Sequence, residues 1–285
     1  MIANLIAVVR GEFFKLRRRP MAWVLLGICV LFGQALVWSG YVAYASLQAR
    51  APDSAALAQQ YASFVLPESL VWVFRVASSI GLIAVAILTA SVMGSEYGLA
   101  TLRPMLIRGI GRASYLVGKL ATLMLAAGAA LLVTGVLAAA SSVVAAVLAT
   151  APPGGAPPSA SWSDALGGWL ITWLSLLPYI ALTAMVTVLA RSASVGMAVS
   201  LGYYLLESVL SATLTSTGSA GFGRIAGYLL LHNITAVTRG GFIGVAGGTA
   251  TEGPAALRLA LYTVVMATIT LVVFLRRDIH GPSGN

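Results

Sequence analysis

The sequence predicts an all-α polytopic membrane protein with six transmembrane helices, and three observations support this. Of the 285 residues, 59% are hydrophobic and only 9% are charged. The mean hydropathy is +0.93. The 17 basic residues lie mostly at the ends of long apolar runs. Such a composition excludes an ordinary soluble surface and suits a chain surrounded by lipid.

Six uncharged or nearly uncharged runs are long enough to cross a bilayer, for which a helix needs about 20 mostly apolar residues. The first follows a basic cluster, as in a signal peptide, but it is too long for a cleaved segment, so we predict a retained anchor. The last needs Arg258 inside it to reach full length. We expect one transmembrane domain over residues 1–285, with spans at about 21–45, 76–95, 119–149, 165–190, 193–217 and 257–275.

The distribution of Lys and Arg predicts the orientation of these spans. With six spans both termini lie on one side, and that side has twelve basic residues against five on the other. The twelve are Arg10, Lys15, Arg17, Arg18, Arg19, Arg103, Arg108, Arg112, Lys119, Arg191, Arg276 and Arg277, and the five are Arg50, Arg75, Arg224, Arg239 and Arg258. The positive-inside rule therefore places both termini, including a tail at 276–285, in the cytoplasm.

The N-terminal segment, residues 1–19, has the pattern of an amphipathic helix. At 100° per residue its apolar side chains fall within an arc of about 100°, with Asn4, Lys15 and Arg18 opposite. The apolar arc comprises Ile2, Leu5, Ile6, Val9, Phe13 and Leu16. We predict an interfacial elbow helix that turns into the first span at Pro20. It either only sets orientation or also contacts a cytosolic partner, and the sequence leaves both open.

The segment from Ser95 to Lys119 places one Glu, three Arg and one Lys between two long apolar runs. Within it, Thr101 opens a short stretch that Gly109 and Gly111 close. This pattern predicts a short helix on the membrane surface, able to present side chains to a groove of a partner. The alternative is that these charges only hold the loop in the cytoplasm.

On these residues the chain resembles the membrane subunits of ABC-2 type ABC transporters. In that family the second span runs into a Glu, an aromatic or basic residue, Gly-Thr, a Leu-rich turn, a basic residue and a Lys. The matching residues here are Glu96, Tyr97, Gly98, Thr101, Leu102, Arg103, Leu106, Arg112 and Lys119. The pattern departs from the family where Leu99 and Ala100 separate Gly98 from Thr101, and where Pro104 interrupts the expected coupling helix.

Two further motifs are similar to the family, so the resemblance covers nearly the whole chain. FLRRDI at 274–279 looks like its basic-Asp ending. GEFFKLRRRP at 11–20 looks like its Glu-x-x-Lys elbow, whose charged residues are Glu12, Lys15, Arg17, Arg18 and Arg19.

The resemblance implies a function and a set of partners. Two such membrane subunits, expected to form a homodimer in a bacterial plasma membrane, sit on two copies of a separate subunit that binds ATP and Mg. Closure of that pair drives export of an amphipathic small molecule, drug or lipid. Residues Glu96 to Arg103 form the coupling segment, with Arg108 and Arg112 as salt-bridge partners.

Several chemistries are excluded by what the sequence lacks. A phosphate-binding GxxxxGK[ST] loop is missing, because Ala113 stands at the first Gly position and Leu120 follows Lys119. With two His and neither an HExxH nor a paired-carboxylate motif, we expect no enzyme, no metal and no cofactor on this chain. Despite a net charge of +9, the basic residues suit lipid headgroups, so we expect no nucleic-acid partner.

Glu207 in the fifth span is the clearest acidic intramembrane residue, where a charge costs about 2.5–3.5 kcal/mol. It either contacts a cationic or hydroxylated substrate or forms a hydrogen bond to Ser or Thr of a neighbouring span.

Between 218 and 256, the stretch 225–237 is too short and polar to cross twice, which predicts a re-entrant element. There His232 and Asn233 either line an exit gate or pack inside the element.

The alternative function is a self-contained channel or secondary carrier whose second loop is only topological. A carrier is expected to show internal repeats or broken helices in matching halves, and the sequence shows neither convincingly. A third reading, a membrane scaffold that transports nothing, leaves Glu207 without a clear purpose.

Overall fold

The computed structural model describes residues 2–51, 54–98, 111–152, 160–216, 225, 227–240 and 252–276. All regular structure among these residues is helical. Six stretches are long and apolar enough to span a membrane: α2, α4, α6, the pair α7 and α8, α9, and α12. The predicted all-α class is thereby confirmed for the described residues, and six such helical stretches fit a multi-pass membrane protein.

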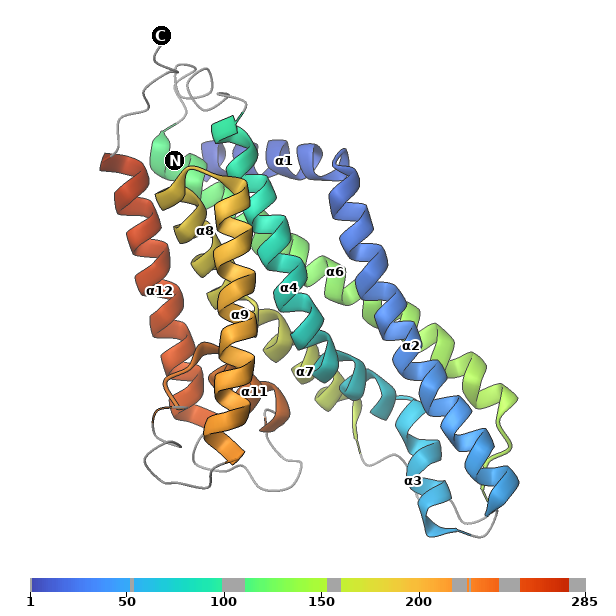
Figure 1. Cartoon of the computed structure of the whole chain (residues 1–285). Helices are drawn as coiled ribbons and strands as arrows, with labels where there is room; N and C mark the ends of the chain where they lie inside the picture. The colour runs from blue at the N-terminus through green and yellow to red at the C-terminus, as the bar shows by residue number, and fades with distance from the viewer. Residues whose placement is uncertain are drawn as a thin grey trace.

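Helix α1 (Ile2–Arg17) lies across one end of the bundle, the end at which α12 (Glu252–Arg276) terminates, as Figure 1 shows. It packs against α6 (Arg112–Leu148) with Val8, Glu12 and Leu16 buried. Within the predicted apolar arc, Ile6 is 61% exposed and Leu16 is buried. The buried face is rotated relative to that arc because it includes a carboxylate, Glu12, that finds a cation on α6.

Helix α2 (Pro20–Arg50) has proline in its first turn, where the missing N–H is no loss. It continues five residues beyond the predicted end of the span, because its far end packs against α3 (Ala55–Phe64), a helix that the sequence did not predict. The contact is aromatic: the ring centroids of Tyr44 and Phe64 are 5.5 Å apart and those of Tyr44 and Tyr61 are 5.4 Å apart.

Helices α4 (Glu68–Gly98) and α6 each begin well before the predicted start of the span. The predicted spans start at 76 and 119, the first directly after a charged residue and the second at one, whereas both helices begin earlier. Arg75 lies inside α4 with its guanidinium 5.2 Å from the centroid of the Trp72 ring. Lys119 lies inside α6 with acidic partners. Each helix therefore extends beyond the predicted span, because a charge that has a partner does not end a helix.

The fourth span is two helices rather than one, α7 (Trp162–Ser175) and α8 (Leu177–Ala190). The interruption is at Leu176, just before Pro178, which has no N–H to continue the ladder of hydrogen bonds. Ser161 and Asp164 form a capping box that starts α7. A left-handed residue, Arg191 with φ of 52°, then turns the chain into α9 (Ala193–Ser216).

Helix α11 (Leu230–Gly240) is a short element between α9 and α12, at the end of the bundle opposite α1 (Figure 1). It packs against α7, α9 and α12. The main core joins buried side chains of α4, α6, α8, α11 and α12 around Tyr179 and Leu123. Predicted site residues that lie outside the described part of the chain are Thr101, Leu102, Arg103 and Arg108.

Candidate functional site

Four charged side chains and one tyrosine meet where α1, α4 and α6 come together, and we call them the ion cluster: Glu12, Lys15, Glu96, Tyr115 and Lys119. Lys119 Nζ forms an ion pair with Glu96 Oε1 and lies 3.6 Å from Glu12 Oε2. Lys15 Nζ lies 2.5 Å from Glu12 Oε1 and 4.0 Å from Glu96 Oε1. The Lys119 ammonium also donates a hydrogen bond to the Tyr115 hydroxyl at 3.2 Å.

Most of this charge is buried. The Lys119 side chain is 1% exposed, and those of Glu12 and Glu96 are 6% and 8% exposed. Two cations and two carboxylates balance one another, as buried ions must, since an unpaired buried charge costs several kcal/mol. The fourth charge is that of Lys15, whose side chain is half-exposed.

Two of the three helices that hold the ion cluster, α4 and α6, precede and follow one segment of the chain. Glu96 lies two residues before the end of α4, and Tyr115 and Lys119 lie one helical turn apart near the start of α6. Between those helices lies 99–110, which contains four of the predicted coupling residues, Thr101, Leu102, Arg103 and Arg108. Glu12 and Lys15, three residues apart, bring α1 to the same place.

Arg19 adds a second connection near the ion cluster. Its guanidinium donates to the Ser91 carbonyl oxygen at 3.3 Å and to Ser95 Oγ at 2.9 Å. Because Arg19 lies between α1 and α2, these bonds tie the turn of the predicted elbow to the last turns of α4. The bend between α1 and α2 is therefore held against the helix that leads into 99–110.

The structure brings together some of the predicted coupling and elbow residues and separates others. Glu96 is buried, while Arg17 and Arg18 remain exposed. Arg112 instead donates to the carbonyl oxygen of Leu275 on α12 at 3.3 Å. Tyr97 packs against the main core, and Gly98 ends α4.

Sequence reasoning missed the central role of Lys119 and Tyr115. Lys119 was taken to mark the start of a span, and Tyr115 was not singled out. A usable signal was present: two of the eight acidic residues of a chain with net charge +9, Glu12 and Glu96, flank predicted spans and need a cation.

A second polar group surrounds Glu207 at the other end of the bundle. Glu207, 1% exposed on α9, accepts hydrogen bonds from the Tyr179 hydroxyl at 3.3 Å and from the backbone N–H of Leu231 at 2.5 Å. Leu231 belongs to the first turn of α11, whose N–H groups have no partner within the helix. Glu207 therefore caps α11 from a neighbouring span, with partners other than the expected Ser or Thr.

Asn233 completes the start of α11. Its side-chain amide donates to the carbonyl oxygens of Gly227 at 2.9 Å and Leu229 at 2.6 Å. Arg258 of α12 donates to the same Gly227 oxygen at 2.8 Å. Glu207 and Asn233 thus both hold the first turn of α11, while the half-buried side chain of His232 forms no hydrogen bond with the described residues.

We expect Glu207→Ala to destabilise the protein by about 2 kcal/mol, because it leaves the buried N–H of Leu231 without an acceptor. Glu207→Gln is expected to cost less than half of that, since its amide oxygen can still accept this bond. Thermal unfolding of the purified chain in detergent measures both. Equal losses for the two variants would show that the carboxylate charge, not the cap, is what α11 requires.

The sequence model of a family described as a protein of unknown function, DUF2705, matches residues 21–280 of this chain. No curated protein matches it.

Proposed function

The chain belongs to the DUF2705 family, and we propose that it is the membrane-spanning permease subunit of an ATP-driven ABC-2 type transporter. In this proposal ATP and Mg bind to a separate subunit, present in two copies beneath a homodimer of this chain. The transporter exports an amphipathic small molecule, drug or lipid across a bacterial plasma membrane. Both termini then face the cytoplasm, as the distribution of basic residues predicts.

The ion cluster is the observation that carries this proposal. It joins α1 to the two helices that precede and follow 99–110 in the chain, with Glu96 before that segment and Lys119 after it. A partner that moves 99–110 would act on α1, α4 and α6 together, because separating these buried ions from one another is costly. A loop that served only to set topology has no need of such a connection.

Three finer elements follow from this proposal. Helix α1 is the elbow helix, at the level of the cytoplasmic headgroups, and 99–110 contains the coupling helix, with Arg103 and Arg108 facing the ATPase. Helix α11 is the re-entrant element at the outer end of the pathway. The hydrogen bonds of Glu207 and Asn233 at the start of α11 support a fixed position for this element.

The test is affinity purification of the tagged full-length chain from its native membrane, followed by assay of the eluate for ATP hydrolysis. We expect an ATPase subunit to co-elute with the wild-type chain and to be lost from Arg103→Ala/Arg108→Ala. We expect the charge-balanced variant Glu96→Gln/Lys119→Met to retain the ATPase, with the hydrolysis rate lowered roughly tenfold, a usual size for coupling between sites.

Glu68→Gln is the matched control, because Glu68 lies at the opposite end of α4 and accepts a bond from the backbone N–H of Ala160. It should leave both co-elution and hydrolysis unchanged. A wild-type chain that elutes alone, without nucleotide hydrolysis, would favour the self-contained channel or carrier. An ATPase that stays bound and fully active in every variant would show that the coupling segment is misassigned.

A further inference from the structure

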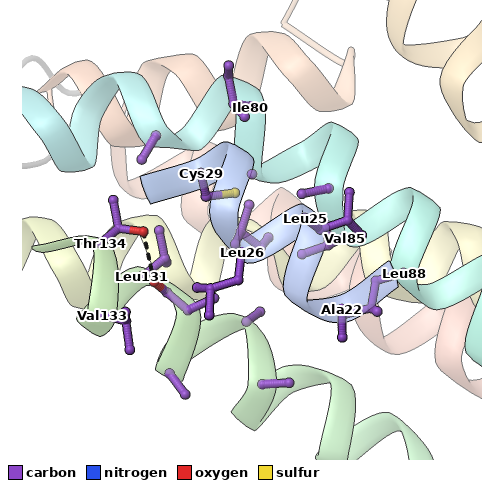
Figure 2. Close-up of a pocket in the computed structure, with 18 of the residues that line it drawn as sticks. Ala22, Leu25, Leu26, Cys29, Ile80, Val85, Leu88, Leu131, Val133 and Thr134 are labelled. Atoms are coloured by element: carbon purple, nitrogen blue, oxygen red, sulfur yellow. Dashed lines mark hydrogen bonds between the residues drawn. The ribbon is translucent and has the colours of Figure 1, made fainter. Parts of the chain in front are cut away.

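An apolar cavity of about 250 Å³ lies between α1, α2, α4 and α6, on the side of the bundle away from α12. Figure 2 shows Leu26 and Cys29 of α2 between α6, which carries Leu131, and α4, which carries Val85. Thr134 is the polar residue of the inner wall of the cavity. The Thr134 hydroxyl donates a hydrogen bond to the Ala130 carbonyl oxygen at 2.9 Å. An apolar cavity of this kind excludes water and accepts hydrocarbon.

The inner end of the cavity is closed by a contact between α2 and α6. A Cβ placed on Gly33 would lie 2.8 Å from the Thr134 methyl group, so the two helices touch there. From Ala22 near the mouth to Gly33 the wall runs eleven residues along α2, roughly 16 Å at 1.5 Å per residue. One leaflet of the hydrocarbon core is about 15 Å deep. The cavity therefore has the depth of one lipid tail.

The mouth of the cavity has the features of a membrane interface. Arg17 lines it and is exposed, and none of the ion pairs among the described residues involves Arg17. Trp23, also at this end, donates its indole N–H to the Arg17 carbonyl oxygen at 2.8 Å. Tryptophan at this level is typical of the headgroup region. A guanidinium here is suited to a phosphate, which it can bind through two hydrogen bonds.

We propose that this cavity is a binding site for one anionic phospholipid, with an acyl chain between α2, α4 and α6 and the phosphate at Arg17. The wall along α2 is as long as an acyl chain, and the positive charge at the mouth suits an anionic headgroup. The closed inner end stops the acyl chain at mid-membrane. The site does not depend on the proposed transport function. Because α1 and α2 both line the cavity, a bound lipid would brace the bend between them.

The test uses the purified full-length chain in vesicles of equal parts phosphatidylcholine and phosphatidylglycerol. A diazirine on the acyl chain of either lipid is photolysed, and the labelled peptides are identified by mass spectrometry. We expect the phosphatidylglycerol probe to label 22–33 and 126–134 preferentially. Arg17→Gln should reduce this labelling about tenfold, the effect of losing a charge-assisted hydrogen bond.

Variants with larger side chains in the cavity test whether the acyl chain lies there. Ala130→Leu, and independently Ala84→Leu from the α4 side, should abolish labelling of the cavity peptides, since both residues line it. The controls are Arg18→Gln, whose guanidinium lies 4.4 Å from the Phe14 ring instead, and Ala140→Leu on an exposed part of α6. Neither should change the labelling.

Two outcomes would overturn the proposal. Equal labelling by the phosphatidylcholine probe would show that no anionic headgroup is selected. Labelling spread evenly over the lipid-facing helices, unchanged by both cavity-filling variants, would show that the cavity holds no chain. Retention of a single elution volume on size exclusion establishes that each variant is folded.

Discussion

Lys119→Met is expected to destabilise the protein by about 3–5 kcal/mol, the usual cost of removing one partner of a buried ion pair. Glu12 and Glu96 would be left in the protein interior with only the half-exposed Lys15 to balance them. Methionine has nearly the volume of lysine, so packing is largely preserved and the loss reports the charge. Unfolding of the purified chain in detergent, followed by circular dichroism, measures the change.

Two variants separate charge balance from simple damage at this site. Glu96→Gln/Lys119→Met again leaves one cation and one carboxylate, Lys15 and Glu12, and should recover most of the lost stability. Lys15→Met should cost clearly less than Lys119→Met, because Lys15 is half-exposed and solvent can screen its charge. If the double variant were no more stable than Lys119→Met alone, the stabilising effect of the cluster would not arise from balanced charge.

Gly94→Ala is expected to destabilise the protein by about 3 kcal/mol, at the upper end for overpacking. A Cβ on Gly94 would lie 2.4 Å from both Cα and Cβ of Ala193, so α4 and the start of α9 touch through their backbones. Backbone cannot rotate away as a flexible side chain does, and the two helices must separate. Thermal unfolding in detergent is again the measurement.

Gly202→Ala on α9 is the matched control, because a Cβ there meets nothing within 4 Å. Alanine favours a helix over glycine by about 1 kcal/mol, so this variant should be neutral or slightly stabilised. If both alanine variants proved equally stable, α4 and α9 would not pack through the contact at Gly94.

The spans could be predicted from the sequence because a long apolar run has one stable place, the bilayer, whatever its neighbours are. The extent of the helices could not, because whether a helix continues past a charged residue depends on the partners of that charge. Arg75 and Lys119, which mark the starts of two predicted spans, lie inside helices, one over the Trp72 ring and the other between two carboxylates.

The candidate site was predicted in part. Glu12, Lys15 and Glu96 were singled out as charged members of two separate motifs, the elbow and the coupling segment. That Glu12 and Glu96 share one cation, Lys119, could not be read from the sequence. Glu12 and Lys119 are 107 positions apart, and only the packing of α1 on α6 joins them. Glu207 was identified as a buried acid, but its partner is a backbone N–H, and every residue except proline carries one.

The sequence by itself determined the all-helical class of the described residues and the six segments long and apolar enough to span a membrane, because hydrophobic length and the distribution of charge are local properties. The tertiary structure alone decided which buried charges neutralise one another, which helix Glu207 caps and where α2, α4 and α6 leave space for a lipid chain. These features depend on contacts between residues distant in the chain, whose identity follows from how the helices pack.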